Sequence, residues 1–147
     1  MKTFLLLLIL SSFIQSAFLP FNLVLVLLVA RSLAVEDRNN LVLAFAGGLA
    51  LSFLTQTNLG YWPLVLVLTV KLTGMIKKLP LSFNPLIIFL SGIVIVWAVA
   101  LTGSVFINEK IQISNHLIES VLIVPVFYLV RAWEERFVVK GTIRLKM

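Results

Sequence analysis

The only histidine of the chain, His116, stands three residues before Glu119. On a helix these two side chains share a face, and an imidazole beside a carboxylate is a pair that can relay protons or help to hold a metal ion. One histidine and one carboxylate are too few for a zinc site built by the protein alone, and the sequence has no cysteine. Because the pair lies at the start of an apolar segment, we expect it at the membrane interface, in a structural role. The sequence predicts no catalytic residue, no metal and no cofactor.

Other polar residues inside apolar segments could line a transport path or support helix contacts. Gln15 and Ser16 lie toward the end of the first apolar segment, and Thr69 and Thr73 lie in the fourth. A transport site needs convergent polar groups near the middle of the membrane. These residues are sparse and uncharged, so the sequence favours a role in helix packing over a pore.

The elements that must position these residues are long and apolar. Of the 147 residues, 61% are hydrophobic, and the mean hydropathy is +1.11. A water-soluble domain of this size could not cover so much apolar surface, so the composition predicts an all-α, polytopic membrane protein. We expect about six transmembrane helices in a single membrane domain, followed by a basic cytoplasmic tail at 134–147. The expected spans are residues 3–19, 21–35, 41–54, 61–76, 86–106 and 117–133.

Two features of these spans leave alternatives open. The spans at 21–35 and 41–54 are shorter than the ~20 residues that a bilayer requires, so they either lie in a thinned bilayer or do not cross it fully. No charge separates the first two spans, but residues 3–35 as one helix would be about 50 Å long, too long for one crossing. Pro20 disfavours a helix at Leu19, and Asn22 is a turn residue, which predicts a hairpin at 20–22. A single kinked helix is the alternative.

The positive charges are divided unequally by these spans. With the N-terminus in the cytoplasm, every lysine and arginine except Lys110 falls on the cytoplasmic side, which the positive-inside rule favours. Arg31, Lys71 and Arg131 lie toward the inner ends of their spans, where long side chains can reach the interface. We therefore explain the net charge of +6 by the orientation of the chain in the membrane. The expected partners of these charges are membrane lipids and not nucleic acid. Both termini are predicted to be cytoplasmic.

Small and aromatic residues mark helix contacts and interfaces. Gly47 and Gly48 lie in the middle of the third span, and small residues there allow close helix packing in lipid. Packing within the chain is one interpretation, and a binding face for another protein's helix is the alternative. The run Tyr61-Trp62-Pro63 is predicted to place two aromatic rings at the outer interface.

Several features follow one another in order along the chain: Gln15-Ser16, the proline turn that follows, the second span ending near Arg31, the run Ala46-Gly47-Gly48-Leu49-Ala50-Leu51-Ser52, and Asn58-Leu59-Gly60 before a long fourth span. This order resembles the rod shape-determining protein MreD family, over nearly the whole chain. One position departs from the family pattern, because Ser52 stands four residues after Gly48, where the family commonly has an acidic residue.

The resemblance implies a non-enzymatic, multi-pass component of the bacterial inner membrane that belongs to the cell-shape and peptidoglycan elongation machinery. It implies a direct partner in MreC, the bitopic scaffold protein, and indirect association with MreB and the peptidoglycan synthases. It also implies a fold like the substrate-binding subunits of energy-coupling-factor transporters.

The preferred hypothesis is therefore a scaffold that binds the transmembrane helix of an MreC-like partner. Its predicted helix-packing and partner residues are Gln15, Ser16, Gly47, Gly48, Asn58 and Gly60. The alternative is a small solute-binding subunit of a transporter, which would need a polar cavity lined by the loops at 55–60 and 108–116. A deep pocket with several convergent polar groups would favour that alternative. A membrane enzyme is disfavoured because the sequence has no catalytic constellation.

Overall fold

The structure is a computed structural model that describes residues 2–78 and 84–137. Within these residues the chain forms six α-helices and no strand, which confirms the all-α prediction. The helices are α1 (Lys2–Phe18), α2 (Leu23–Ala34), α3 (Asn39–Leu54), α4 (Tyr61–Lys77), α5 (Pro85–Phe106) and α6 (Ile113–Phe137).

Local sequence explains where several of these helices begin and end. α1 ends at Phe18, and α2 begins at Leu23, so the break expected near Pro20 is present. The side chain of Asn22 caps α2 by accepting a hydrogen bond from the backbone N–H of Leu25. Asn84 caps α5 in the same way, and Pro85 occupies the first turn, where its missing N–H has no cost. α6 extends beyond its expected span at both ends and includes the start of the predicted tail, while residues 138–147 lie outside the described residues.

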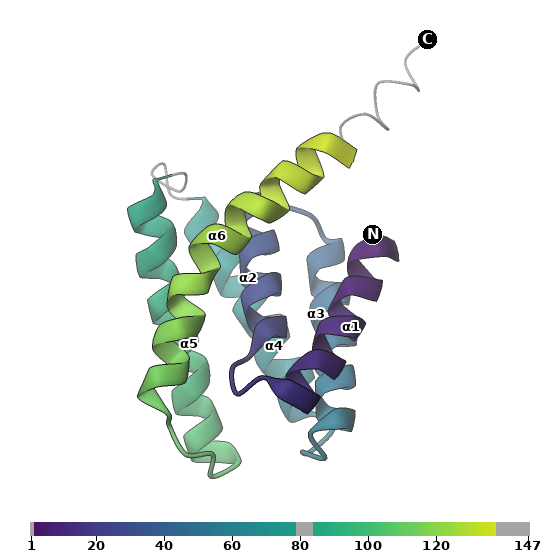
Figure 1. Cartoon of the computed structure of the whole chain (residues 1–147), viewed down its shortest axis with the longest axis vertical. Coiled ribbons are helices and arrows are strands. Elements are labelled where there is room, and N and C mark those ends of the chain that lie inside the picture. Colours follow the sequence, from purple (N-terminus) through teal and green to yellow (C-terminus); the bar gives the residue numbers. More distant parts are fainter. Residues whose placement is uncertain (1, 79–83, 138–147) are drawn as a thin grey trace.

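α2 is the central helix of the bundle. It packs against α1, α3, α4 and α6, and nine of its 12 residues are buried. Figure 1 shows α6 crossing in front of α2 from the side of α5. At 1.5 Å per residue α2 is only about 18 Å long. Because other helices surround it, α2 does not have to match the thickness of a bilayer by itself.

The outer surface of the bundle is rich in large apolar side chains. Every helix except α2 carries some that are more than a third exposed, among them Phe53 at 78%, Leu64 at 60% and Leu129 at 70%. Soluble monomers rarely expose apolar surface this extensively. The core beneath is made chiefly of leucine, isoleucine and valine, with Phe127 as its largest fully buried side chain.

Only two of the described helices are both long and apolar enough to cross a membrane, namely α5 with 22 residues and α6 with 25. The expectation of about six such spans is therefore not met, because the other four helices, α1 to α4, have 17, 12, 16 and 17 residues. Of these four, only the second expected span is longer than its helix, at 15 residues against 12, because its apolar residues continue into the turns, where the chain is no longer helical.

The helices run up and down, so their connections gather at two ends (Figure 1). One end, called the Arg31 end, holds the start of α1, the α2–α3 connection at 35–38 and the end of α6. The other, called the cavity end, holds the connections at 19–22, 55–60 and 107–112.

Candidate functional site

A cavity of about 610 Å³ opens at the cavity end, between the tips of the helices. It is lined by residues of all six helices, of the α1–α2 connection and of the loop at 109–112. Its polar lining includes Gln15, Asn22, Glu109, Lys110, His116 and Glu119. A volume of this size is typical of small-molecule sites. Both predicted residues of the first span, Gln15 and Ser16, line this cavity.

Glu119 is the buried charge of the cavity, with 3% of its surface exposed. One carboxylate oxygen accepts a hydrogen bond of 2.6 Å from the backbone N–H of Asn22, and the other lies 3.0 Å from Nδ1 of His116. A buried carboxylate is tolerated when its oxygens are bonded in this way. Glu119 therefore fastens the α1–α2 turn to α6. The sequence correctly paired His116 with Glu119 but did not predict the bond to Asn22, because 97 residues separate the two.

Trp62 is a cavity residue that the sequence assigned to the membrane interface. Its side chain is 8% exposed, so it lies inside the bundle rather than at its rim. The indole N–H is the one buried side-chain polar atom among the described residues that has no hydrogen-bond partner. Such groups are rare, because leaving a buried donor unpaired costs about 1–3 kcal/mol. Burial and a missing partner could not be predicted from the Tyr-Trp-Pro motif.

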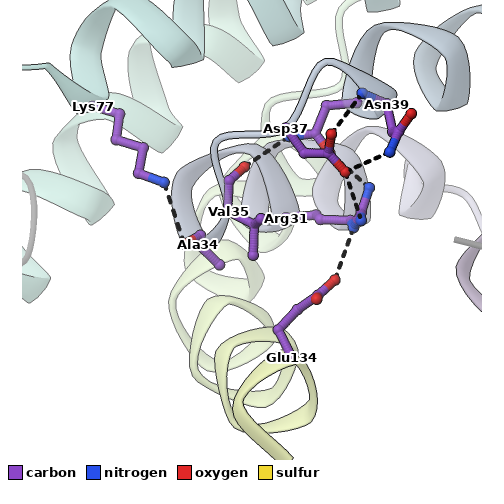
Figure 2. A network of polar contacts seen from close by, with 8 residues as sticks. Arg31, Ala34, Val35, Asp37, Asn39, Lys77 and Glu134 are labelled. Carbon is purple, nitrogen blue, oxygen red and sulfur yellow. Dashed lines mark hydrogen bonds and ion pairs between the residues drawn. The ribbon is translucent and has the colours of Figure 1, made fainter. Parts of the chain in front are cut away.

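A second polar site lies at the Arg31 end and is built around Arg31 itself (Figure 2). This side chain is 4% exposed, so the expectation that it reaches the membrane interface is wrong. Its Nε donates to Glu134 of α6 at 3.1 Å, and its Nη1 donates to the side-chain oxygen of Asn40 at 2.6 Å. Its guanidinium lies 4.7 Å from the ring centre of Phe4 in α1, within the range of a cation–π contact. One side chain thus joins α1, α2, α3 and α6.

The α2–α3 connection completes this Arg31 cluster. Asp37 accepts hydrogen bonds from the backbone and side-chain N–H groups of Asn39, and its carboxylate lies 3.9 Å from Nη2 of Arg31. The bonds from Asn39, together with the nearby guanidinium, hold the pKa of Asp37 below its usual value. Lys77 of α4 donates to the carbonyl of Ala34, which ends α2 (Figure 2). All the described parts of the bundle except α5 meet at this cluster.

Gly47 and Gly48 lie inside the bundle at different helix contacts. A Cβ on Gly48 would lie 2.4 Å from the backbone Cα of Pro63, so only glycine allows α3 and α4 this close. A Cβ on Gly47 would lie 3.4 Å from Val24 of α2, an ordinary contact. Both glycines are buried by this chain's own helices, so neither is part of the exposed surface.

The remaining predicted residues belong to the α3–α4 turn. The backbone oxygen of Asn58 accepts from the backbone N–H of Tyr61 at 3.0 Å and from the hydroxyl of Ser52 at 3.5 Å. Gly60 is exposed, and a Cβ there would meet nothing within 4 Å. The structure therefore brings Gln15 and Ser16 together at the cavity, and joins Asn58 to α3 next to the contact of Gly48.

The cavity can bind a small molecule, and the Arg31 cluster holds helices together. In the described part of the chain, no three histidine, aspartate or glutamate residues lie together as a metal site. No protein family, curated protein or solved structure that was compared matches this chain.

Proposed function

We propose that this chain is a non-enzymatic, multi-pass scaffold of the bacterial inner membrane, of the MreD type, that acts in cell shape and peptidoglycan elongation. All six helices would then lie in the membrane as one body, with α2 enclosed and the Arg31 end facing the cytoplasm. The exposed apolar side chains of the five outer helices support this proposal, because an apolar surface of this kind is stable in contact with lipid.

The observation that carries the MreD-type assignment is the geometry of the motif in α3 and the following turn. Residues that resemble the family only as a loose pattern form one compact unit, in which Gly48 contacts the backbone of Pro63 and Ser52 bonds to Asn58. Ser52 is 1% exposed, so the position where the family commonly has an acidic residue is an internal one here. The close packing of α3 against α4 at Gly48 supports the resemblance over these two helices.

The partner of this scaffold would be an MreC-like protein with a single transmembrane helix, and through it MreB and the peptidoglycan synthases. Because Gly47 and Gly48 are enclosed, the partner helix would meet the exposed outer faces rather than these glycines. The two glycines would act indirectly, by setting the shape of those faces.

Co-purification from the native membrane tests the scaffold. The tagged chain is expected to retain a one-span protein with a coiled coil, and depletion of the chain is expected to turn rod-shaped cells round. An adjacent gene for such a one-span protein would agree with this outcome. Recovery of an ATPase, with no one-span protein and no change in cell shape, would contradict it.

The cavity favours a second candidate, a small solute-binding subunit of a transporter. Polar groups from four parts of the chain converge on it, as this function requires, and the loop at 109–112 contributes to its lining. For this function an ATPase should co-purify in place of the one-span protein, and its gene is expected beside that of this chain.

A further inference from the structure

A second pocket, called the α4 pocket, lies at the Arg31 end of the bundle. It is lined by the end of α2, the α2–α3 connection, the start of α3 and the last turns of α4. It opens to the outside of the bundle, where its lining residues Leu41 and Met75 are 41% and 63% exposed. Its volume of about 250 Å³ is below the ~300 Å³ at which small-molecule sites begin, so the pocket admits one part of a larger molecule.

One face of α4 forms a wall of this pocket. Lys71, Gly74, Met75 and Lys78 line it and follow one another at helical spacing, so they share that face. Gly74 stands between the two lysines, and a Cβ there would meet nothing within 4 Å. The space between the two lysine side chains is therefore open.

The charged groups of the pocket are of both signs. Two lysines and two carboxylates line it, so their formal charges balance. One carboxylate is already used, because Asp37 accepts two hydrogen bonds within the Arg31 cluster. In the described part of the chain, the side chains of Lys71, Lys78 and Glu36 make no hydrogen bond or ion pair.

The other polar groups around the pocket are satisfied within the chain. The hydroxyl of Ser32 donates to the carbonyl of Val70, and both ends of the Asn40 amide are bonded. Lys77, which interacts electrostatically with Glu36, donates to a backbone carbonyl. Recognition therefore falls to the two unpaired lysines and Glu36. A ligand that completes them must carry an anion, such as a phosphate, next to a cationic donor.

Exposed apolar side chains lead away from the pocket. On α3, Leu41 is followed one turn later by Phe45, and on α4, Leu68 and Leu72 precede Met75 on the same face. Since α3 begins at the pocket and α4 ends there, both rows run from the pocket toward the middle of the bundle. A ligand with acyl chains would cover these rows, whereas a soluble one would not.

We propose that the α4 pocket binds the headgroup of a zwitterionic phospholipid, with its phosphate between Lys71 and Lys78 and its primary amine at Glu36. The acyl chains lie along the exposed apolar rows of α3 and α4. This inference rests on the membrane placement proposed above and goes beyond both candidate functions, because it requires neither a one-span partner nor an ATPase.

Native mass spectrometry of the full chain in a neutral detergent tests the headgroup. The probes are phosphatidylethanolamine, phosphatidylcholine and phosphatidylglycerol with the same acyl chains. Phosphatidylethanolamine is expected to bind about fivefold or more tightly than either of the others. The methylated amine of phosphatidylcholine cannot donate to Glu36, and phosphatidylglycerol has no cation. Glycerophosphoethanolamine, the same headgroup without acyl chains, is expected not to bind at the same concentration.

Two substitutions of one glycine test the pocket itself. Gly74→Leu places a side chain in the open space between the lysines and is expected to weaken binding of phosphatidylethanolamine at least about tenfold. Gly74→Ala adds only a methyl group and is expected to keep binding within about threefold of the unchanged chain. Both replace a glycine in a helix by a better helix former, so the fold is expected to persist.

Charge variants test the two parts of the headgroup. Glu36→Gln is expected to remove the preference for phosphatidylethanolamine over phosphatidylcholine while both still bind. Lys71→Gln is expected to weaken all three lipids about tenfold. Lys2→Gln removes an equal charge from an exposed lysine of α1 that does not line the pocket, and it is expected to change nothing.

Several results would overturn the proposal. Tighter binding of phosphatidylglycerol than of phosphatidylethanolamine would assign the pocket to anionic lipids, and equally tight binding of glycerophosphoethanolamine would assign it to a soluble phosphate ester. Equal effects of Lys71→Gln and Lys2→Gln would reduce the binding to general attraction by a basic protein. If Gly74→Leu does not fold, this lysine pair decides. Lipid binding is measured on the purified chain alone, so it can fail independently of partner co-purification.

Discussion

Arg31 shows how one residue can act differently from what its place in the sequence indicates. Near the end of an apolar segment, an arginine is expected to reach toward the interface. Here the chain surrounds it instead, with Glu134, Asn40 and Phe4 as partners. A planar guanidinium with five donors can satisfy several groups at once, which the single ammonium of lysine cannot do in the same geometry. The partners come from three other helices, so no local pattern could name them.

Two neighbouring glutamates of α6 allow a matched test of this cluster. Glu134→Gln is expected to lower the free energy of unfolding by about 1.5–3 kcal/mol, because it weakens a charge-assisted hydrogen bond to a buried arginine. Glu135→Gln should change it by less than about 1 kcal/mol, because the ion pair of Glu135 with Arg131 is exposed on both sides. Chemical unfolding of the two variants in the same detergent measures the difference.

Arg31→Met extends the same measurement. It leaves Glu134 without its cation, so a cost of about 3–5 kcal/mol is expected. The double variant with Glu134→Met should recover part of this loss, because the unpaired carboxylate is removed. Equal stability of the Glu134 and Glu135 variants, with full additivity in the double variant, would contradict a structural role for the Arg31 cluster.

Among the elements, α2 explains how short apolar helices fit the bundle. Its segment was expected to be a span of 15 residues, but Asn22 and the Arg31 cluster limit the helix to Leu23–Ala34. Polar groups that terminate it lie at both tips, namely the Glu119 bond at the cavity end and Arg31 at the other. A helix shorter than the bilayer is stable in this setting because its ends meet polar protein groups instead of lipid.

The contact between α3 and α4 gives a prediction at the scale of elements. Gly48→Ala is expected to destabilise the fold by about 1–3 kcal/mol or more, because the new methyl group meets the backbone of Pro63 and the helices must separate. Gly47→Ala is expected to be neutral or to stabilise by up to about 1 kcal/mol, because it fits beside Val24 and removes a flexible residue from the helix. Thermal unfolding of both variants in one detergent measures the contrast.

Variants of the two glycines also distinguish an effect on helix packing from an effect on partner binding. If partner co-purification falls with Gly48→Ala and remains with Gly47→Ala, the glycine motif acts through the α3–α4 contact. If Gly47→Ala is the more damaging change, this assignment of the two contacts is wrong.

For the whole molecule, the up-and-down order of the helices brings the start of α1 and the end of α6 to the same end (Figure 1). Alkaline phosphatase, which is active only outside the cytoplasm, gives a direct test of the proposed orientation. Fusions within the connections at 55–60 and 107–112 are expected to be active, and a fusion at the C-terminus inactive. A fluorescent protein at the C-terminus should show the reverse result. An active C-terminal phosphatase fusion would rule out the proposed arrangement.

By itself, the sequence determined the class of the fold and the approximate place of each helix. The apolar segments, Pro20 and Asn22 are local signals, and helix formation responds to local signals. The pairing of His116 with Glu119 followed from the same helical geometry.

The tertiary structure alone decided which helix is enclosed, that Arg31 and Trp62 are buried, and that Gln15, Asn22 and Glu119 meet at one cavity. These features depend on contacts between residues far apart in the chain, such as the 103 positions between Arg31 and Glu134. Composition does not identify which residues make such contacts, because any apolar face can pack against several others. Only the complete set of packed helices selects one arrangement.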